Sequence, residues 1–364
     1  MPTSRIARRP ILSLVITAAV AATGCDEPRS ASGVAAAHDH ACALLSSGEV
    51  RCWGRNDEGQ LGDGTTEDRF TPVPVAGVSD AIAVAVGGGS SCAARRDGTA
   101  VCWGRGRPGG DEPGPELVAG LERATSVALG GRHACAVRGD GQVMCWGDNE
   151  SGQLGDGSIT RRAEAMPVSS ASGEGALAEV IALAVGAAHS CALIADRTVE
   201  CWGSNRAAEL GDRRGERVRL LPAPVPGLRG VVSLAARGHL TCALDQQEMV
   251  RCWGSQQIMR AEGPRHFEWP SPVHVGTFRR AVEIAVAEDR ACVRRLDGEI
   301  ECWPPDGPPA PVPERPEATS IALGAGFGCA HTRSTVACWG QVNQRGQLGD
   351  GTNQFHEGPR EVRW

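Results

Sequence analysis

Seven pairs of cysteines, each followed at once by a tryptophan, constrain the fold of this chain more than any other feature. In every pair the second cysteine comes nine or ten residues after the first. Successive pairs begin 37 to 56 residues apart, a period typical of one repeated structural unit. The pairs are Cys42/Cys52, Cys92/Cys102, Cys135/Cys145, Cys191/Cys201, Cys242/Cys252, Cys292/Cys302 and Cys329/Cys338, and the tryptophans are Trp53, Trp103, Trp146, Trp202, Trp253, Trp303 and Trp339.

The apolar residues within each unit indicate strands. The runs 82–86 (Ile-Ala-Val-Ala-Val) and 181–185 (Ile-Ala-Leu-Ala-Val) lack the three- and four-residue spacing of an amphipathic helix. A chain of seven short, strand-rich units is better suited to one ring or stack than to several independent domains. We therefore expect an all-β fold.

Each cysteine pair predicts a hairpin. The midpoint of Cys42 and Cys52 is residue 47, which leaves residues 46–48 as a three-residue loop. Such loops favour a left-handed third residue, and glycine occupies that position in four units, at Gly48, Gly98, Gly141 and Gly298. The pair Cys329/Cys338 is one residue closer and predicts a two-residue turn at 333–334.

The opposed cysteines of each hairpin are within disulfide reach, because directly opposed residues at a non-hydrogen-bonded site have Cα atoms ~4.5 Å apart. Zinc is the competing interpretation. Structural zinc sites usually take ligands from close CxxC pairs, and the chain has none. We expect seven disulfides, no metal and no cofactor, and therefore an oxidising compartment.

The fifteenth cysteine, Cys25, ends a segment laid out like a secretory signal. Three arginines precede an apolar run over 11–22, which is too short for a spanning helix. The sequence Ala22-Thr23-Gly24-Cys25 resembles the bacterial lipoprotein processing motif, which implies cleavage of residues 1–24 and lipid attachment to Cys25. An ordinary signal with a free cysteine is the alternative. We expect residues 25–32 to be a lipidated tether and the protein to be extracytoplasmic, anchored to a bacterial membrane.

Charge argues against nucleic acid as a partner. The formal net charge is −6, and removal of residues 1–24 takes away three arginines and no acidic residue, which leaves −9. Proteins whose main ligand is a polyanion are usually basic.

The repeat itself resembles that of the regulator of chromosome condensation (RCC1-like) family. The pattern is most complete in His40–Gly62, where a His-Xaa-Cys-Ala-Leu strand leads to Cys-Trp-Gly and then to Gly-Gln-Leu-Gly. The last motif recurs at 152–155 and 346–349, with a degraded copy at 209–211. The resemblance covers residues 33–364 and implies a seven-bladed β-propeller of four-stranded blades.

The two ends of the chain suggest how the ring closes. Residues 34–37 match the strand that precedes later cysteine pairs, and residues 359–362 match the strand at 72–75. We expect one blade to combine strands from both ends, which would remove the open edges of a linear sheet.

Several recurring polar residues suggest catalysis or metal binding. His40, His133 and His189 each precede a first cysteine by two residues. The favoured interpretation is a structural hydrogen bond made once per blade, because other residue types hold this position in the remaining units. The Gly-Asp-Gly segments at 62–64 and 155–157 are interpreted as turns, since they lack the oxygen ligands of a calcium loop.

The first candidate contact site is the segment His266-Phe267-Glu268-Trp269, in a diverged loop. It concentrates aromatic residues in a chain with few of them. Loops carry binding residues and aromatic anchors dominate interface energetics, so His266, Phe267 and Trp269 are the predicted partner-binding residues. The alternative is that these aromatics pack on the neighbouring blade.

Three functions fit the chain. The first is an envelope-tethered module that binds or regulates another protein in the cell envelope or outside the cell. The second, implied by the family resemblance, is guanine nucleotide exchange; no long insertion like the family's exchange wedge is visible in the sequence. The third is a propeller-type lyase or hydrolase, although no unique cluster of acids and histidines is present. We favour the binding module, with no catalytic residue assigned.

Overall fold

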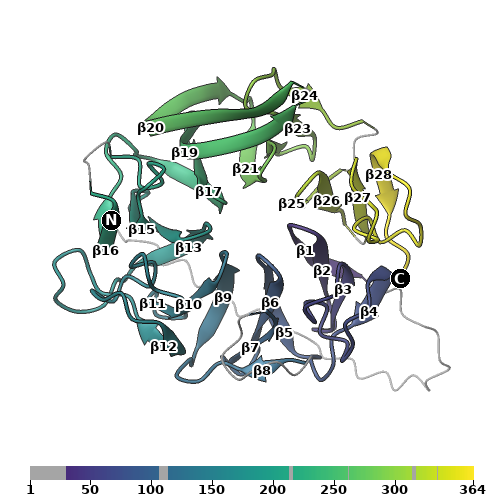
Figure 1. The fold of residues 1–364 in the computed structure, drawn as a ribbon, viewed down its shortest axis with the longest axis horizontal. Helices are drawn as coiled ribbons and strands as arrows, with labels where there is room; N and C mark the ends of the chain where they lie inside the picture. Colours follow the sequence, from purple (N-terminus) through teal and green to yellow (C-terminus); the bar gives the residue numbers. More distant parts are fainter. Residues whose placement is uncertain (1–29, 106–113, 213–215, 261, 314–316, 334) are drawn as a thin grey trace, which may run out of the picture.

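The computed structural model describes the chain except residues 1–29, 106–113, 213–215, 261, 314–316 and 334. Its strands form seven four-stranded antiparallel sheets arranged around a ring (Figure 1). The predicted all-β, seven-bladed propeller is confirmed. Within the described residues there is no helix with the length and apolar character needed to span a membrane. The predicted signal segment and Cys25 lie outside the described residues.

Each blade is one continuous stretch of chain, and the strands of a blade follow one another outward from the ring centre (Figure 1). Blade 1 is β1 (Ala31–Ala37), β2 (His40–Leu45), β3 (Val50–Gly54) and β4 (Arg69–Pro74); blade 2 is β5 (Ala81–Val86), β6 (Ser90–Arg95), β7 (Ala100–Gly104) and β8 (Glu116–Leu117). Blade 3 is β9 (Ala124–Leu129), β10 (His133–Arg138), β11 (Val143–Gly147) and β12 (Arg162–Pro167); blade 4 is β13 (Val180–Val185), β14 (His189–Ile194), β15 (Val199–Ser204) and β16 (Val218–Pro224). Blade 5 is β17 (Val231–Arg237), β18 (Leu240–Asp245), β19 (Met249–Arg260) and β20 (Gly263–Thr277); blade 6 is β21 (Ala281–Val286), β22 (Ala291–Arg295), β23 (Ile300–Trp303) and β24 (Ala310–Pro311). Blade 7 is β25 (Ser320–Gly324), β26 (Phe327–His331), β27 (Val336–Gly340) and β28 (His356–Glu361).

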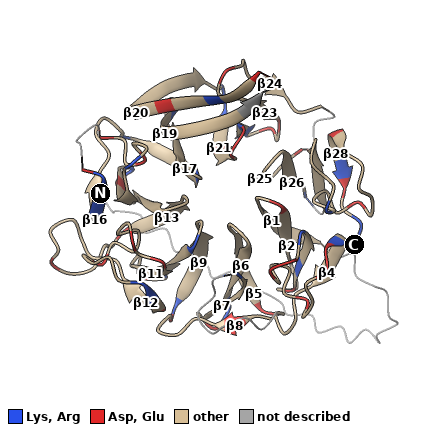
Figure 2. Ribbon diagram, in the orientation of Figure 1, with Lys and Arg blue, Asp and Glu red and all other residues tan. Residues whose placement is uncertain are grey.

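The innermost strands line the centre of the ring with small apolar side chains. Their alanines, valines and leucines, with Ile284 and one charged residue, Arg237, surround a central cavity of about 260 Å³, to which all seven blades contribute. Figure 2 shows that charged residues lie mainly on turns and outer strands, whereas most of the inner ribbon is uncharged. Alternation along these short strands places one set of side chains at the centre and the other set between blades.

The seven cysteine pairs are disulfides within single blades, between the second and third strands. The two cysteines of each pair stand directly opposite one another, with Cα atoms 4.0 to 4.1 Å apart. The hairpin register read from the sequence is therefore the one present in the structure. The bonds are Cys42–Cys52, Cys92–Cys102, Cys135–Cys145, Cys191–Cys201, Cys242–Cys252, Cys292–Cys302 and Cys329–Cys338.

The shorter hairpin of blade 7 closes as its spacing predicts. The Thr332 amide donates a hydrogen bond to the Thr335 carbonyl (2.9 Å), so two residues separate the ends of the ladder that carries Cys329 and Cys338. One of the two, residue 334, lies outside the described residues.

A register shift follows the second cysteine in five blades, and sequence reasoning missed it. Between Cys201 and Gly203 of β15, for example, the partner on β16 moves from Ala223 to Arg219, so the outer strand carries extra residues opposite the tryptophan. Such bulges bend a strand and re-aim its side chains. The cysteine spacing predicts only the pairing of the second strand with the third, and that pairing is regular. The cysteines that precede a shift are Cys52, Cys145, Cys201, Cys252 and Cys338.

The predicted closure of the ring is wrong. The N-terminal strand β1 belongs to blade 1 and the C-terminal strand β28 to blade 7, so no blade combines the two ends. The resemblance of 34–37 to first strands and of 359–362 to fourth strands is real. Because β1 is the first strand of blade 1 and β28 is the fourth strand of blade 7, both blades are complete by themselves.

Blades 7 and 1 are instead joined by a shared apolar core and by hydrogen bonds and ion pairs. The Trp53 indole donates a hydrogen bond to the carbonyl of Gln347 (2.9 Å), and His331 Nε2 donates to the carbonyl of Ala31 (2.8 Å). Arg345 forms an ion pair with Asp68 (3.0 Å). These contacts join residues about three hundred positions apart without any shared sheet.

Deletion of residues 359–364 should destabilise the ring although no blade is shared. The deletion removes half of β28 together with Val362, which is buried and donates a hydrogen bond to the Val336 carbonyl. We expect a loss of about 3 kcal/mol, from one buried apolar side chain and the hydrogen bonds of an edge strand. Urea denaturation measures it, with the exposed-site variant Arg360→Ala as the control. Equal midpoints for the deletion and the control would contradict the expectation.

Blade 5 carries an extension that sequence reasoning missed. The segment expected to be a diverged loop is strand, and the pairing of β19 with β20 continues past the disulfide, from Gly254/Trp269 to Arg260/Gly263. Figure 1 shows these two strands as the longest of the ring. The hairpin therefore projects from blade 5 beyond the length that the other blades share.

Candidate functional site

A loop after the third strand fills the junction between neighbouring blades at four places in the ring. The tryptophan of the next blade donates its indole N–H to a carbonyl of this loop, at 2.8 to 2.9 Å. The leucine that follows this carbonyl is fully buried in each loop. The carbonyls belong to Gln60, Gln153, Glu209 and Gln347, the leucines are Leu61, Leu154, Leu210 and Leu348, and the tryptophans are Trp103, Trp202, Trp253 and Trp53.

Internal hydrogen bonds shape this loop. In blade 1 the Asn56 side chain accepts from the Leu61 amide (2.9 Å) and donates to the Thr65 carbonyl (3.0 Å). Asp63 accepts from the Thr65 amide and hydroxyl (3.0 and 2.7 Å) and pairs with Arg69. The Gly-Asp-Gly segments are therefore turns, as expected. No group of three His, Cys, Asp or Glu side chains suited to a metal ion occurs in the described residues.

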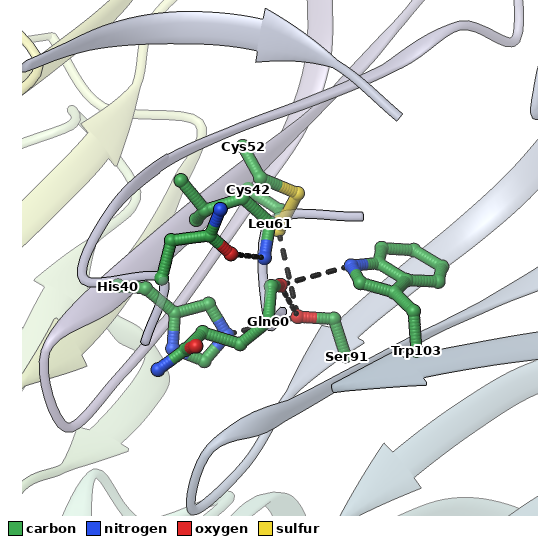
Figure 3. The surroundings of a disulfide bond; sticks show 8 residues. His40, Cys42, Cys52, Gln60, Leu61, Ser91 and Trp103 are labelled. Atoms are coloured by element: carbon green, nitrogen blue, oxygen red, sulfur yellow. Dashed lines mark hydrogen bonds between the residues drawn. A yellow bond between two sulfur atoms is a disulfide. The ribbon is translucent and has the colours of Figure 1, made fainter. Parts of the chain in front are cut away.

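The repeat histidines extend the same junction (Figure 3). His40 Nε2 lies 2.8 Å from the Ser91 hydroxyl, which in turn donates to the Gln60 carbonyl (2.9 Å). Since the Ser91 proton is used on that carbonyl, His40 is the donor to Ser91. His133 with Ser190 and His189 with Thr241 make the same contact between blades. The predicted structural hydrogen bond is present at all three positions.

The repeat histidines are held in the neutral form. Burial lowers the pKa of His40 and of His133 to about 3, and that of His189 to about 4. A histidine that acts as an acid or base near neutral pH needs a pKa close to the working pH. These three side chains therefore serve the packing of the ring.

Three tryptophans lack the loop contact. No hydrogen bond joins the indole N–H of Trp146, Trp303 or Trp339 to any described residue. The rings of Phe278 and Trp303 are stacked, with their centroids 4.6 Å apart, and the cavity beside Trp303 has a volume of about 40 Å³. The cavity beside Trp146 is about 30 Å³. Beside Trp339 the space is much larger.

The junction pocket, as we name the space between blades 6 and 7, has a volume of about 790 Å³. It opens at the end of the ring that carries the turns between first and second strands. Ligand sites usually occupy 300 to 1,000 Å³ and combine an apolar lining with a few polar groups, which describes this pocket. The apolar lining includes Ile258, Trp303, Val312, Trp339 and Val342, and the polar residues are Asp39, Gln257, Glu288, Asp289, Arg290, Gln341 and Glu357.

The junction pocket is acidic, with four carboxylates and one guanidinium among its lining residues. Arg290 is paired with Asp289 (2.8 Å), whose second oxygen is buried without a hydrogen-bond partner. His38 pairs with Glu288 (3.1 Å), and this hydrogen bond holds the pKa of Glu288 below its usual range. Asp39 is paired in turn with Arg55 (3.3 Å), so three of the four carboxylates already have a partner and Glu357 is the fourth.

The predicted contact residues lie on the hairpin that forms one wall of this pocket. Gln257 lines the pocket and pairs across the hairpin with His266, which is exposed. Phe267 is half-buried and stacks on Trp269, with ring centroids 6.0 Å apart. Trp269 packs against the core shared by blades 5 and 6. The alternative interpretation therefore applies to Trp269. His266 lies opposite the pocket residue Gln257, and Phe267 lies opposite Gln256 on the same hairpin.

Sequence reasoning did not find the pocket itself. Its residues come from blades 1, 5, 6 and 7, and most of them belong to no shared motif. The sequence marks the pocket only by a missing motif. After Trp303 the chain continues with Pro304 and Pro305, and no Gly-Gln-Leu-Gly follows before the next blade.

Comparison with known sequences identifies the repeat. Two family models described as the regulator of chromosome condensation (RCC1) repeat match, one over residues 47–94 and 140–193 and the other over 32–60 and 124–153. The human E3 ubiquitin-protein ligase HERC2 is 33% identical over 231 residues, 59% of this chain and 5% of HERC2. The ultraviolet-B receptor UVR8 of Arabidopsis thaliana is 32% identical over 232 residues, 62% of this chain and 42% of UVR8. The match thus spans less than half of either relative.

Solved structures show the same fold. Human WBSCR16 superposes with a TM-score of 0.72 at 19% identity, covering 87% of this chain and 95% of WBSCR16. Yeast RCC1 (Prp20), crystallised with Kap60, gives a TM-score of 0.61 at 19% identity and covers 91% of this chain and 74% of that one. Repeat sequence and propeller architecture agree: the chain carries RCC1-like repeats at the matched residues and shares the fold of these propellers.

Proposed function

We propose that this chain is an extracytoplasmic propeller that binds another protein through blades 5 to 7, on the surface formed by the junction pocket and the β19–β20 hairpin. The observation that carries the proposal is the pocket itself, at a junction where the filling loop is absent and a cavity of about 790 Å³ lies beside Trp339. A continuous wall of Gln257 and Ile258 connects it to the hairpin.

The location is part of the proposal. Seven disulfides suit an oxidising, extracytoplasmic compartment. Removal of residues 1–24 and lipid attachment at Cys25 would tether the propeller to a membrane through residues 25–32, and the partner would be an envelope or extracellular protein. The yeast relative, crystallised in complex with Kap60, is a propeller of this fold that binds a protein.

Binding, rather than catalysis, suits the chemistry of the pocket. Its Arg290 is neutralised by Asp289, and Glu288 is held ionised by His38. Such paired charges give orientation and specificity to a bound surface. The aromatic and apolar lining supplies the desolvated centre that protein interfaces require.

A pair of surface variants tests the proposed function. Phe267→Ser alters the β19–β20 hairpin, and Leu296→Ser alters an apolar but remote residue, 66% exposed in the turn between β22 and β23 at the opposite end of the ring. With the oxidised domain from residue 26 as bait in envelope extracts, one protein should be retained by the wild type and by Leu296→Ser. Phe267→Ser should reduce its retention about thirtyfold, the effect of losing an aromatic anchor. Equal retention by all three baits would contradict the proposal.

A further inference from the structure

We propose that the junction pocket receives a loop of the partner protein that imitates the chain's own Gly-Gln-Leu-Gly loops, with a leucine-like side chain against Trp339, a backbone carbonyl on the Trp339 indole N–H, and a cationic residue beside them. This inference rests on the proposed function and specifies the chemistry of the partner. The propeller would thus accept from another molecule the element that blade 6 lacks.

Trp339 occupies the same position as the four tryptophans that bind such loops. It stands directly opposite Gly328 in the hairpin of blade 7, just as Trp53 stands opposite Ala41 in blade 1. Both indoles are buried. At Trp53 the loop of the preceding blade supplies the acceptor carbonyl, and its Leu348 packs in the same core cluster. The core around Trp339 contains no leucine from the blade 6 loop.

The chain of blade 6 is unable to build this loop. Between Trp53 and β4, blade 1 has residues 54–68, whereas only residues 304–309 separate Trp303 from β24. Two prolines begin this short connection, and proline has no N–H for the internal hydrogen bonds that shape the loop. The asparagine that organises the other loops is also absent there.

One group in the pocket is complementary to a peptide backbone. The Trp339 indole N–H is a donor without a described acceptor, and Trp339 lines the cavity. At the four filled junctions the equivalent indole N–H donates to a backbone carbonyl. A peptide segment brings such a carbonyl, whereas a purely apolar ligand brings none.

The charge of the pocket indicates which residue type should flank the leucine of the incoming loop. The lining has four carboxylates and one guanidinium, and although Asp39, Glu288 and Asp289 have partners of their own, acidic groups predominate and favour a cationic partner residue. The chain provides a precedent at the junction of blades 7 and 1. There Arg345, two residues before Gln347, pairs with Asp68 of the receiving blade (3.0 Å).

A peptide of the chain's own loop is the probe. We would synthesise residues 343–349 (Asn-Gln-Arg-Gly-Gln-Leu-Gly), cyclise them head to tail, and titrate them into oxidised, ¹⁵N-labelled protein while recording the indole N–H signals by NMR. One indole signal should shift downfield and saturate, and it should be absent from Trp339→Phe. A peptide with alanine in place of leucine should bind at least about tenfold more weakly, because it loses three buried carbon atoms.

Two protein variants make the result specific. Ala310 is exposed on β24 and lines the pocket, so Ala310→Trp should obstruct the pocket without disturbing the core and should abolish the shift. Trp53→Phe removes an indole that already has its carbonyl, and the peptide should bind this variant as it binds the wild type. No shift at the Trp339 indole, or undiminished binding to Ala310→Trp, would overturn the inference.

Failure of this inference is distinguishable from failure of the proposed function. A captured protein that is lost with Phe267→Ser but retained by Ala310→Trp would leave the hairpin as the contact and exclude loop insertion. Binding of the peptide with no captured protein would support the pocket chemistry while contradicting the proposed function.

Discussion

Reduction of the seven disulfides is expected to unfold the ring at temperatures where the oxidised protein is folded. Each bond closes a loop of about ten residues, and by the chain-entropy model such a bond stabilises by about 3 kcal/mol. The combined contribution exceeds the 5 to 15 kcal/mol that is typical of whole domains, although the terms need not add. Thermal unfolding followed by circular dichroism, with and without a phosphine reductant, measures the effect.

A single disulfide provides the matched test. Replacing Cys135 and Cys145 together by alanine should lower the free energy of unfolding by about 2 to 4 kcal/mol and leave the fold intact. The two alanines remain buried and apolar, so the change isolates the cross-link. A reduced wild type with an unchanged melting temperature would show that inter-blade packing alone maintains the ring.

Acidification from pH 7.5 to 5.5 is expected to destabilise the folded ring by several kcal/mol. Burial depresses the pKa of His40, His133 and His189 to between about 3 and 4, whereas in the unfolded chain each titrates near 6.5. Below pH 6.5 the unfolded state therefore binds protons that the folded state does not. Each histidine costs about 1.4 kcal/mol per pH unit until its folded pKa is reached. Urea midpoints at the two pH values measure the loss.

Two other histidines oppose this trend. His38 and His239 donate hydrogen bonds to the carboxylates of Glu288 and Glu209, which raises the pKa of both histidines. Their contribution to stability is therefore fully present below pH 6.5 and is lost as the pH rises through the raised values. Both side chains are about half exposed, which limits their effect. The variant His133→Gln should reduce the slope of the unfolding free energy against pH, because about one proton fewer is taken up on unfolding. An unchanged slope would contradict the assignment of His133 as a buried neutral group.

The pairing of the second and third strands could be predicted from the sequence because the two cysteines of each hairpin show which residues stand opposite one another. The opposition of Cys42 and Cys52, and the left-handed Gly48 at the third loop position, follow from the spacing of a few residues. The hydrogen bonds of His40, His133 and His189 follow from their repetition, since a residue that recurs once per blade serves the repeat.

Pairing with the fourth strand could not be predicted in this way. The register shifts after Cys201, Cys252 and Cys338 depend on an outer strand that carries no cysteine and whose distance from the tryptophan varies between blades. Without a fixed spacing there is no midpoint from which to count the pairs.

Contacts between blades could not be predicted from the sequence either. Ring closure was predicted wrongly because sequence matches show which strands are equivalent but do not show which sheet contains them. Both ends matched complete blades, and the contacts that close the ring are core packing between blades 1 and 7 and hydrogen bonds such as that of Trp53 with Gln347.

The candidate site was predicted only in part. The aromatic cluster at 266–269 pointed to blade 5, but its strand conformation was hidden by prolines and by the lack of the usual alternation. The junction pocket results from a missing loop, so no motif marks it. Comparing the residues after each Cys-Trp pair reveals the gap after Trp303, and the structure shows that nothing from neighbouring blades among the described residues fills it.

The most direct test of the binding surface is site-specific photo-crosslinking in the living cells that produce the protein. A benzophenone amino acid at Gln257, on the wall between the hairpin and the junction pocket, should form a covalent adduct with one other protein. The same probe at Leu296, on the opposite end of the ring, should form none. Adducts of equal yield at both positions, or none at Gln257, would contradict a protein-binding role for this surface.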